Sequence, residues 1–436
     1  MRRAFRLLGF VLLAGVLLTP ALAGGAVALG AVAAAPHYHV LHTFAGSPDG
    51  AEPYAGLTMD AGGDLYGTTY RGGAEGTVFR LTPGLHGLWT ERILFDFSNP
   101  SVSGGFPLGD VAVDANRNVY GTAGPGAFNN GVVFELRHAP SSVALWNVDV
   151  LHTFKGDGDG IQPFAGVVFD TAGNLYGDTV ASGPIGGSCG TVYQLTPANG
   201  TWVENLLHIF TCKPDGSFPS ADLVFDSAGN LYGTTQHGGI GCRNVGCGQV
   251  FELAYNGGTW VKSTIYNFKD GADGIQPNSA LVFDKAGNLY GTTAVGGTGP
   301  CVIEGIAGCG TVFELTRQPS GWKKTVIYRP DGTSGGGLFG GVVFDDAGNL
   351  YGTMSFYGIV GPSCAAGCGS VFKLTPQGRL WRPTTLYAFM GGADGGEPFD
   401  RLLVTPGGIY GTTIYGGSSA YPCQIQGCGV VFEITP

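Results

Sequence analysis

Short stretches of alternating apolar and polar residues run along the chain from residue 38 onward, each four to seven residues long. Gly, Pro, Asn and Asp separate one stretch from the next. This is the pattern of short β-strands joined by tight turns. No segment here shows the 3.6-residue apolar spacing of an amphipathic helix. The pattern therefore predicts an all-β protein.

The stretches recur as one repeated unit. Each unit holds an apolar run ending in Asp, a Gly-Asn turn, Leu-Tyr-Gly-Thr-Thr, a glycine-rich loop, Val-Phe-Glu-Leu, and a further β-rich run. Four strands per unit and seven units predict a seven-bladed β-propeller with four-stranded blades. The tyrosines that mark the units stand 54 to 61 residues apart and are Tyr66, Tyr120, Tyr176, Tyr232, Tyr290, Tyr351 and Tyr410.

The two ends of the repeat region predict how the ring closes. Residues 40–44 match the fourth strand of a unit but precede the first unit, whereas residues 430–434 match a third strand. The N-terminal strand is therefore predicted to complete the last blade. Closure would protect sheet edges that could otherwise pair with other chains. We expect a single propeller domain over residues 38–436.

Residues 1–23 are typical of a secretory signal peptide. They begin with Arg2, Arg3 and Arg6, continue with an apolar run, and end in Ala-Leu-Ala. A second cleavage site follows Ala35, and a membrane anchor is the alternative, because small and apolar residues continue to that point. We expect a secreted or periplasmic monomer without a membrane span once the leader is removed.

Charge and composition exclude several classes of protein. The formal net charge is −10 for the whole chain, and −13 without the three leader arginines, which argues against a nucleic-acid partner. Only 12% of the residues are charged and 79 are glycines that follow no three-residue period. These values exclude a coiled coil, a collagen and a charge-rich disordered chain.

The repeated Leu-Tyr-Gly-Thr-Thr, Gly-Gly and Gly-Thr-Val-Phe-Glu-Leu segments resemble the bacterial GloVer tandem repeat family over residues 38–436. The Gly-Gly doublet followed by an aromatic residue is also similar, more loosely, to kelch propellers. The GloVer resemblance implies a secreted or surface-anchored protein with no established activity.

All ten cysteines lie beyond the leader. Secretion favours disulfides over a zinc site for the close pairs in the loops between second and third strands. Cys189 lies in such a loop and Cys212 in a connection to the next blade. These loops emerge on the same face of a four-stranded meander, so this pair is predicted to bond too. The close pairs are Cys242 with Cys247, Cys301 with Cys309, Cys364 with Cys368, and Cys423 with Cys428.

Several repeated polar residues are interpreted as architecture. The Asp-x-x-Gly-Asn elements fit tight hairpins better than calcium sites. His42, His152 and His208 occupy a fourth-strand position where other units have Tyr, which favours half-buried polar side chains over metal ligands. The acidic runs at residues 157–160, 270–274 and 394–397 are read as solvated turns. With no nucleophile elbow, zinc-protease motif or phosphate loop, we predict no metal, no cofactor and no catalytic residue.

At one equivalent position of the seven first strands, the units do not all have the same kind of residue. Small residues are expected where seven strands meet at an axis, yet Asp110, Asp222 and Arg401 occur there, with Asp400 one residue earlier. These four residues are predicted to lie near the channel mouth, on the face that carries the variable loops. They could bind a polar ligand, pair with one another and seal the channel, or simply be solvated.

The resulting hypothesis is a secreted, non-enzymatic propeller that binds a glycan, peptide or protein through disulfide-pinned loops on one face. The alternative is an extracytoplasmic lyase or glycan-acting hydrolase that uses Asp110, Asp222 and Asp400 as acid and base. A third possibility is a structural envelope protein without a small ligand, since the fold alone does not define function.

Overall fold

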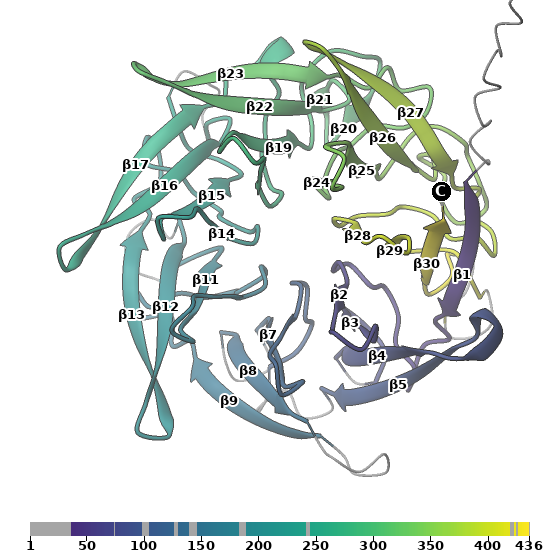
Figure 1. Cartoon of the computed structure of the whole chain (residues 1–436), viewed down its shortest axis with the longest axis horizontal. Coiled ribbons are helices and arrows are strands. Elements are labelled where there is room, and N and C mark those ends of the chain that lie inside the picture. The colour runs from purple at the N-terminus through teal and green to yellow at the C-terminus, as the bar shows by residue number, and fades with distance from the viewer. Residues whose placement is uncertain are drawn as a thin grey trace, which may run out of the picture. The chain divides into compact units, whose positions relative to one another are not determined.

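The computed structural model describes residues 36–73, 75–97, 104–125, 130–138, 146–182, 189–240, 245–418, 423 and 426–435. These residues form seven four-stranded antiparallel sheets in a ring, which confirms the predicted seven-bladed propeller (Figure 1). Their helical content is limited to two 3-10 turns, Leu85–Gly87 and Gly271–Asp273. No helix in this part of the chain has the length and hydropathy needed to cross a membrane.

Within each blade the first strand is innermost and the fourth is outermost (Figure 1). Blade 1 comprises β2 (Thr58–Met59), β3 (Leu65–Thr69), β4 (Thr77–Pro83) and β5 (Trp89–Asp96). Blade 2 comprises β6 (Ala112–Val113), β7 (Val119–Ala123), β8 (Val132–Arg137) and β9 (Asn147–Thr153). Blade 3 comprises β10 (Val168–Phe169), β11 (Leu175–Thr179), β12 (Thr191–Ala198) and β13 (Thr201–Ile209).

The second half of the ring follows the same plan. Blade 4 comprises β14 (Val224–Phe225), β15 (Leu231–Thr235), β16 (Gln249–Asn256) and β17 (Thr259–Asn267). Blade 5 comprises β18 (Val282–Phe283), β19 (Leu289–Thr293), β22 (Thr311–Gln318) and β23 (Gly321–Tyr328), with an extra hairpin of β20 (Val302–Ile303) and β21 (Ile306–Ala307). Blade 6 comprises β24 (Val342–Phe344), β25 (Leu350–Met354), β26 (Ser370–Gln377) and β27 (Leu380–Ala388).

Blade 7 closes the ring as the sequence predicts. It combines β28 (Leu403–Val404), β29 (Ile409–Thr413) and β30 (Val430–Thr435) with β1 (His37–Thr43). Strand β1 runs antiparallel to β30, and in Figure 1 the purple strand lies beside the yellow one. A bulge between Val40 and His42 matches the bulge that every other blade has between its third and fourth strands. The N-terminal strand therefore occupies a regular fourth-strand position.

The glycine of each Leu-Tyr-Gly segment allows close packing inside the blade. Gly233 is the cross-strand partner of Phe251, and a Cβ at Gly233 would lie only 2.6 Å from Phe251 Cζ. The aromatic ring therefore lies directly over the glycine. The same partnership occurs in every blade, and six of the seven aromatic residues are phenylalanine.

The adjacent tyrosine joins one blade to the next. The Tyr232 ring meets Phe283 of blade 5 edge to face at 5.1 Å between centroids. Its hydroxyl donates to Glu252 at 2.6 Å and to the turn residue Asp226 at 3.1 Å. Asp226 also accepts the backbone N–H groups of the tight turn that follows it. The same network of turn aspartate, tyrosine and third-strand glutamate occurs in blades 2 and 5. The aspartate that accepts the turn N–H groups is what the hairpin interpretation predicts.

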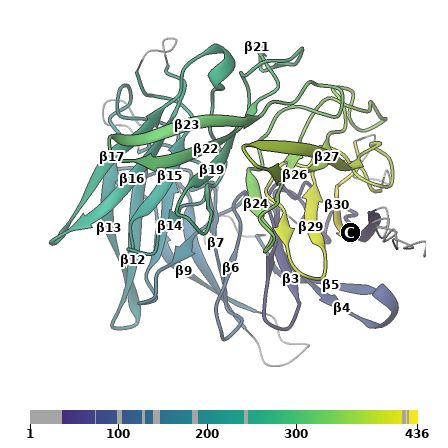
Figure 2. The ribbon, with the colours of Figure 1, turned by 45° about the horizontal axis from the view of Figure 1, so that its top comes forward.

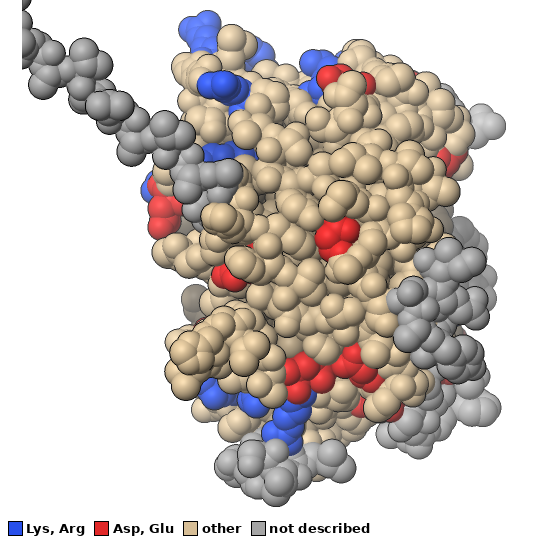
Figure 3. Space-filling model, turned by 90° about the vertical axis from the view of Figure 1, so that its right-hand side faces the viewer, with Lys and Arg blue, Asp and Glu red and all other residues tan. Residues whose placement is uncertain are grey.

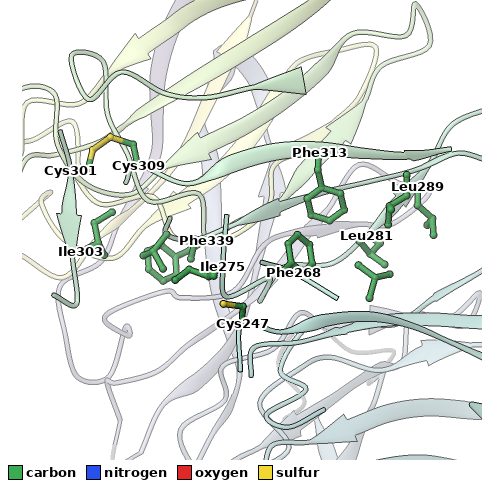
Figure 4. Packing of buried hydrophobic residues seen from close by; sticks show 14 of the residues in the cluster. Cys247, Phe268, Ile275, Leu281, Leu289, Cys301, Ile303, Cys309, Phe313 and Phe339 are labelled. Carbon is green, nitrogen blue, oxygen red and sulfur yellow. A yellow bond between two sulfur atoms is a disulfide. The ribbon is translucent and has the colours of Figure 1, made fainter. Parts of the chain in front are cut away.

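The apolar core lies mostly between blades. At the junction of blades 4 and 5, Phe268 and Phe313 are in edge-to-face contact at 5.2 Å, with Leu281 beside them (Figure 4). The same cluster includes Cys301 and Cys309, which form a disulfide. Figure 2 shows the loop containing β20 and β21 on one side of the ring and the β4–β5 hairpin on the other. On the side of the ring that Figure 3 shows, the described surface is mostly uncharged, with acidic and basic residues in small groups.

We predict that Gly233→Ala lowers the free energy of unfolding by about 1–3 kcal/mol, because the new methyl group would overlap the Phe251 ring. Urea denaturation followed by fluorescence measures this change. The control is Gly407→Ala, because a Cβ there meets its nearest atom at an ordinary 3.6 Å. Equal stability of the two variants would refute the packing role assigned to this glycine.

Candidate functional site

The four residues predicted at the channel mouth lie together in the structure. Asp110, Asp222, Asp400 and Arg401 immediately precede the innermost strands of blades 2, 4 and 7. All four line a cavity of about 800 Å³. Gln426, which lies between the two cysteines of blade 7, also lines this cavity. The cavity therefore opens on the face that carries the disulfide loops.

Arg401 reaches across the channel to two carboxylates. Its Nε lies 2.8 Å from Asp110 Oδ2, and its Nη2 lies 3.4 Å from Asp222 Oδ2. The Asp110 and Asp222 side chains are only 6% and 13% exposed, whereas that of Arg401 is 42% exposed. The mutual pairing considered from the sequence is thus present, but part of the Arg401 side chain remains exposed and lines the cavity.

Each aspartate also ties its blade to the preceding one. Asp110 Oδ1 accepts the backbone N–H of Gly56, and Asp222 Oδ1 accepts that of Gly166, each at 2.7 Å. A Cβ on either glycine would lie 3.0 Å from the carboxylate oxygen. Because these glycines have no side chain, each leaves space for the aspartate of the next blade. A hydrogen bond from the glycine N–H holds each carboxylate in place.

Burial changes the acidity of the site. Desolvation, reinforced by the Asp110 charge, raises the pKa of Asp222 to about 6, against the opposing effect of Arg401. Desolvation and the same neighbour raise the pKa of Asp400 well above its usual range. The Asp110 charge in turn raises the pKa of Arg401. The mouth therefore combines a guanidinium with two carboxyl groups whose neutral forms are favoured by burial, and Asp222 titrates close to neutrality.

Aromatic side chains at the mouth were missed from the sequence. The Phe399 ring stacks on Phe339 at 4.5 Å and meets Tyr54 edge to face at 5.7 Å. Tyr54 contacts Tyr70 at 5.5 Å, and Tyr70 contacts Phe106 of blade 2 at 5.1 Å. We call these five residues the aromatic arc, which runs from blade 6 through blades 7 and 1 to blade 2; Phe339 is buried and the other four are half-buried. A signal existed for two of its members, because Tyr54 and Phe399 each follow a repeated proline just before a first strand.

The disulfide loops are connected to this mouth. In four blades the residue before the repeated proline donates its backbone N–H to a cysteine carbonyl of the preceding blade, as Glu397 does to Cys368 at 2.9 Å. Before Pro107 and Pro163 the acceptors are instead the carbonyls of Glu75 and Asn130. Glu397 has a φ of 56°, which is unusual for a residue with a side chain. The observed disulfides are the predicted Cys189–Cys212, Cys301–Cys309, Cys364–Cys368 and Cys423–Cys428. The predicted Cys242–Cys247 pair involves Cys242, which is outside the described residues.

Blade 3 carries a buried polar pair that the sequence analysis also missed. Asp178 replaces the threonine of Leu-Tyr-Gly-Thr-Thr, and Tyr193 replaces the usual phenylalanine. Both side chains are almost fully buried, and their oxygens have no hydrogen-bond partner among the described residues. In blade 2 the corresponding Thr122 donates to Ala165 O of the next blade at 2.7 Å. Burial raises the pKa of Asp178 well above its usual range, which favours a neutral carboxyl at the position of the hydroxyl.

We predict that Asp178→Thr stabilises the protein by about 1–3 kcal/mol at pH 8, because it replaces a buried unsatisfied group with the hydroxyl used by other blades. The folded-state pKa of Asp178 is raised, so its contribution to stability is full below about pH 4 and is lost as the pH rises. The advantage of the variant should therefore grow with pH.

Urea denaturation at a series of pH values measures this difference. Asp178→Asn is the matched control, because it keeps the shape and polarity but cannot ionise. A stability difference between wild type and Asp178→Asn that does not change with pH would show that Asp178 is not held neutral.

Comparisons with solved structures show the fold alone. A fungal alcohol oxidase of the AA5 family, in complex with copper, superimposes with a TM-score of 0.54 and 13% identity, over 92% of this chain and 77% of that one. A PQQ-bound aldose sugar dehydrogenase from Streptomyces coelicolor gives a TM-score of 0.41 and 13% identity, over 92% and 98% of the two chains. The search of curated proteins gives no match.

The sequence family is defined by the repeat itself. The family model described as the Gloeobacter/Verrucomicrobia repeat matches residues 14–184 and 142–355, which together cover more than half of the chain. This is the family that the Leu-Tyr-Gly and Val-Phe-Glu-Leu segments resemble. The chain belongs to the Gloeobacter/Verrucomicrobia repeat family.

Proposed function

We propose that this protein is an extracytoplasmic, non-enzymatic binding protein that takes a short glycan at the channel mouth. The observation that carries the proposal is the composition of the cavity wall, where aromatic rings stand beside fixed hydrogen-bonding groups. Sugar rings present apolar C–H faces and a rim of hydroxyl groups. A wall of this kind complements both features.

Each part of the wall has a role in this proposal. The half-buried rings of Tyr54 and Phe399 offer apolar surface for a sugar face. The exposed part of Arg401 can donate to hydroxyl oxygens, because a guanidinium has five N–H donors. Asn278 also lines the cavity, and its buried Oδ1 has no hydrogen-bond partner among the described residues. This oxygen can accept a hydrogen bond from a ligand hydroxyl group if the amide turns toward the cavity on binding.

Size and rigidity favour a short glycan over a protein partner. The cavity of about 800 Å³ falls in the range of small-molecule sites, whereas protein interfaces are broader and flatter. The cysteine carbonyls that hold the mouth of the channel keep its backbone in one geometry. Such pre-organisation lowers the entropy that a ligand must overcome on binding.

A location outside the cytoplasm is supported by two features. Residues 1–23 have the pattern of a secretory leader, and disulfides persist mainly in oxidising compartments. We therefore propose that the leader is removed and that the propeller acts in the periplasm or outside the cell.

The proposal is tested by screening the protein beginning at Pro36 on a glycan array and measuring the affinity of each hit by calorimetry. We expect Tyr54→Ala and Phe399→Ala each to weaken binding about tenfold, because each removes a stacking surface. Tyr255→Ala is the control, since Tyr255 is an aromatic residue that is 57% exposed and does not line this cavity. Unchanged affinity in both cavity variants would refute the assignment of the site.

An enzyme is the second candidate, and one observation favours it. Asp222 lines the cavity with a pKa raised to about 6 by burial and by Asp110, so it could exchange protons near neutral pH. The reaction would be glycan elimination or hydrolysis.

If this alternative holds, Asp222→Asn should abolish turnover of the bound glycan while largely preserving its affinity, and the wild-type rate should change around pH 6. Chromatography of the products measures turnover. Intact recovery of every glycan that binds would eliminate the enzyme alternative.

A further inference from the structure

A recurring three-residue junction lies between the outer strands of adjacent blades. It joins a fourth-strand residue, the aspartate seven positions later in the following loop, and a fourth-strand residue of the next blade. We call this arrangement the junction triad. Between blades 3 and 4 it comprises His208, Asp215 and Lys262.

In two junctions a lysine ammonium fills the centre of the triad. Lys262 Nζ lies 2.8 Å from Asp215 Oδ1, and Lys324 Nζ of the next junction lies 2.9 Å from Asp273 Oδ1. The two lysine side chains are only 7% and 3% exposed. The junction is therefore built to hold a positive charge next to the loop aspartate, largely shielded from water.

The junction between blades 2 and 3 has the same geometry without the lysine. Its members are His152 of β9, Asp159 of the following loop and Glu204 of β13, and these two strands lie side by side (Figure 1). Glu204 pairs with the leucine of the third strand, as Lys262 does in the next blade. A carboxylate thus stands where the neighbouring junctions have an ammonium group.

The three side chains surround a space without bonding across it. His152 Nε2 lies 3.7 Å from Asp159 Oδ2 and 3.7 Å from Glu204 Oε1, distances too long for hydrogen bonds. The histidine nitrogen and the glutamate oxygen are buried, and neither has a hydrogen-bond partner among the described residues. The two half-buried carboxylates thus face each other without the buried lysine of the neighbouring junctions, and the cation near them is the exposed Lys155, whose charge acts on His152 and Glu204.

The geometry points to a metal ion in this space: we propose that His152, Asp159 and Glu204 bind a divalent transition metal, with Zn²⁺ as the expected ion. The potential ligand atoms all lie within 4.8 Å of one another. Ligand atoms about 2.0–2.1 Å from a tetrahedral zinc ion are about 3.4 Å apart, so binding requires shifts of only a few tenths of an ångström for the two histidine pairs.

The chemical nature of the three ligand atoms indicates which metal ion the site would bind. One imidazole nitrogen and two carboxylate oxygens suit zinc and its neighbours, whereas calcium prefers six to eight oxygens. Asp159 is already oriented, because it accepts the backbone N–H groups of Lys155 at 3.0 Å and Gly156 at 2.9 Å. Three protein ligands leave a fourth position for water.

The junction between blades 7 and 1 provides an internal contrast. It has the same residue types, His42, Asp49 and Glu91, but His42 Nε2 lies 3.1 Å from Asp49 Oδ1 and is hydrogen-bonded to it. The histidine is therefore engaged with the aspartate, and among the described residues these three side chains do not form a group whose ligand atoms all lie within 4.8 Å of one another, although Glu91 Oε1 is also buried without a hydrogen-bond partner there. We expect one tight metal site per chain, at His152. This differs from the sequence interpretation of His152 as a half-buried polar residue without a metal.

The test uses the protein from Pro36 onward, without a polyhistidine tag and stripped of metal by chelation. Calorimetric titration with Zn²⁺ should give one tight site, and thermal unfolding should shift to higher temperature in its presence. His152→Phe and Glu204→Lys should each weaken the affinity by about 100-fold or more. Phe and Lys are suitable replacements because Phe95 and Lys262 occupy the equivalent positions in other junctions.

His42→Phe is the matched control and should bind Zn²⁺ like the wild type. Circular dichroism checks that each variant is folded, and Glu204→Gln replaces Glu204→Lys if the lysine variant does not fold. The proposal is overturned if the wild type binds no Zn²⁺, or if His152→Phe folds and binds it with unchanged affinity. Loss of binding in His42→Phe but not in His152→Phe would assign the metal to the other junction and would equally refute the proposal.

Discussion

The contact between each second-strand glycine and the aromatic ring opposite it determines how this propeller is built. With no Cβ on Gly233, the Phe251 ring can lie across the inner part of the blade, and the neighbouring tyrosine can point to the adjacent blade. Because this arrangement recurs in every unit, the blades have nearly the same cross-section, and each blade packs on the next through an equivalent apolar surface. The position of the inner strands, and hence the width of the channel mouth, follows from this packing.

The regularity of the units explains why so much of the fold could be predicted. Seven copies of one motif determined the number of blades, and the unpaired strand before the first copy showed how the ring closes. The channel residues were found by the opposite criterion, because Asp110, Asp222 and Arg401 are large where the other copies are small. Their mutual pairing was one of three alternatives, and the sequence could not decide among these because the contacts depend on the distance across the axis between blades 2, 4 and 7.

The sequence analysis missed features that arise when two or more substituted residues become neighbours in the folded structure. Tyr193 looks like a neutral replacement for phenylalanine, and Asp178 like a tolerated change of threonine, until cross-strand pairing places them in one buried region. The junction triads escaped notice for a similar reason. Each is assembled from two blades, and its chemistry is apparent only when equivalent junctions are compared: Lys262 in one stands where Glu204 stands in another.

The pairing of β1 with β30 has a consequence for the time at which the protein can mature. These strands are the first and last of the propeller along the chain, so a ribosome releases one long before it makes the other. The first blades can fold while synthesis continues. Blade 7 can form only after β30 has been made, because its outer strand β1 has no partner until then. Until then, the backbone hydrogen-bonding groups of β1 are unpaired, so the nascent chain can pair with other polypeptides along this strand unless the strand is shielded.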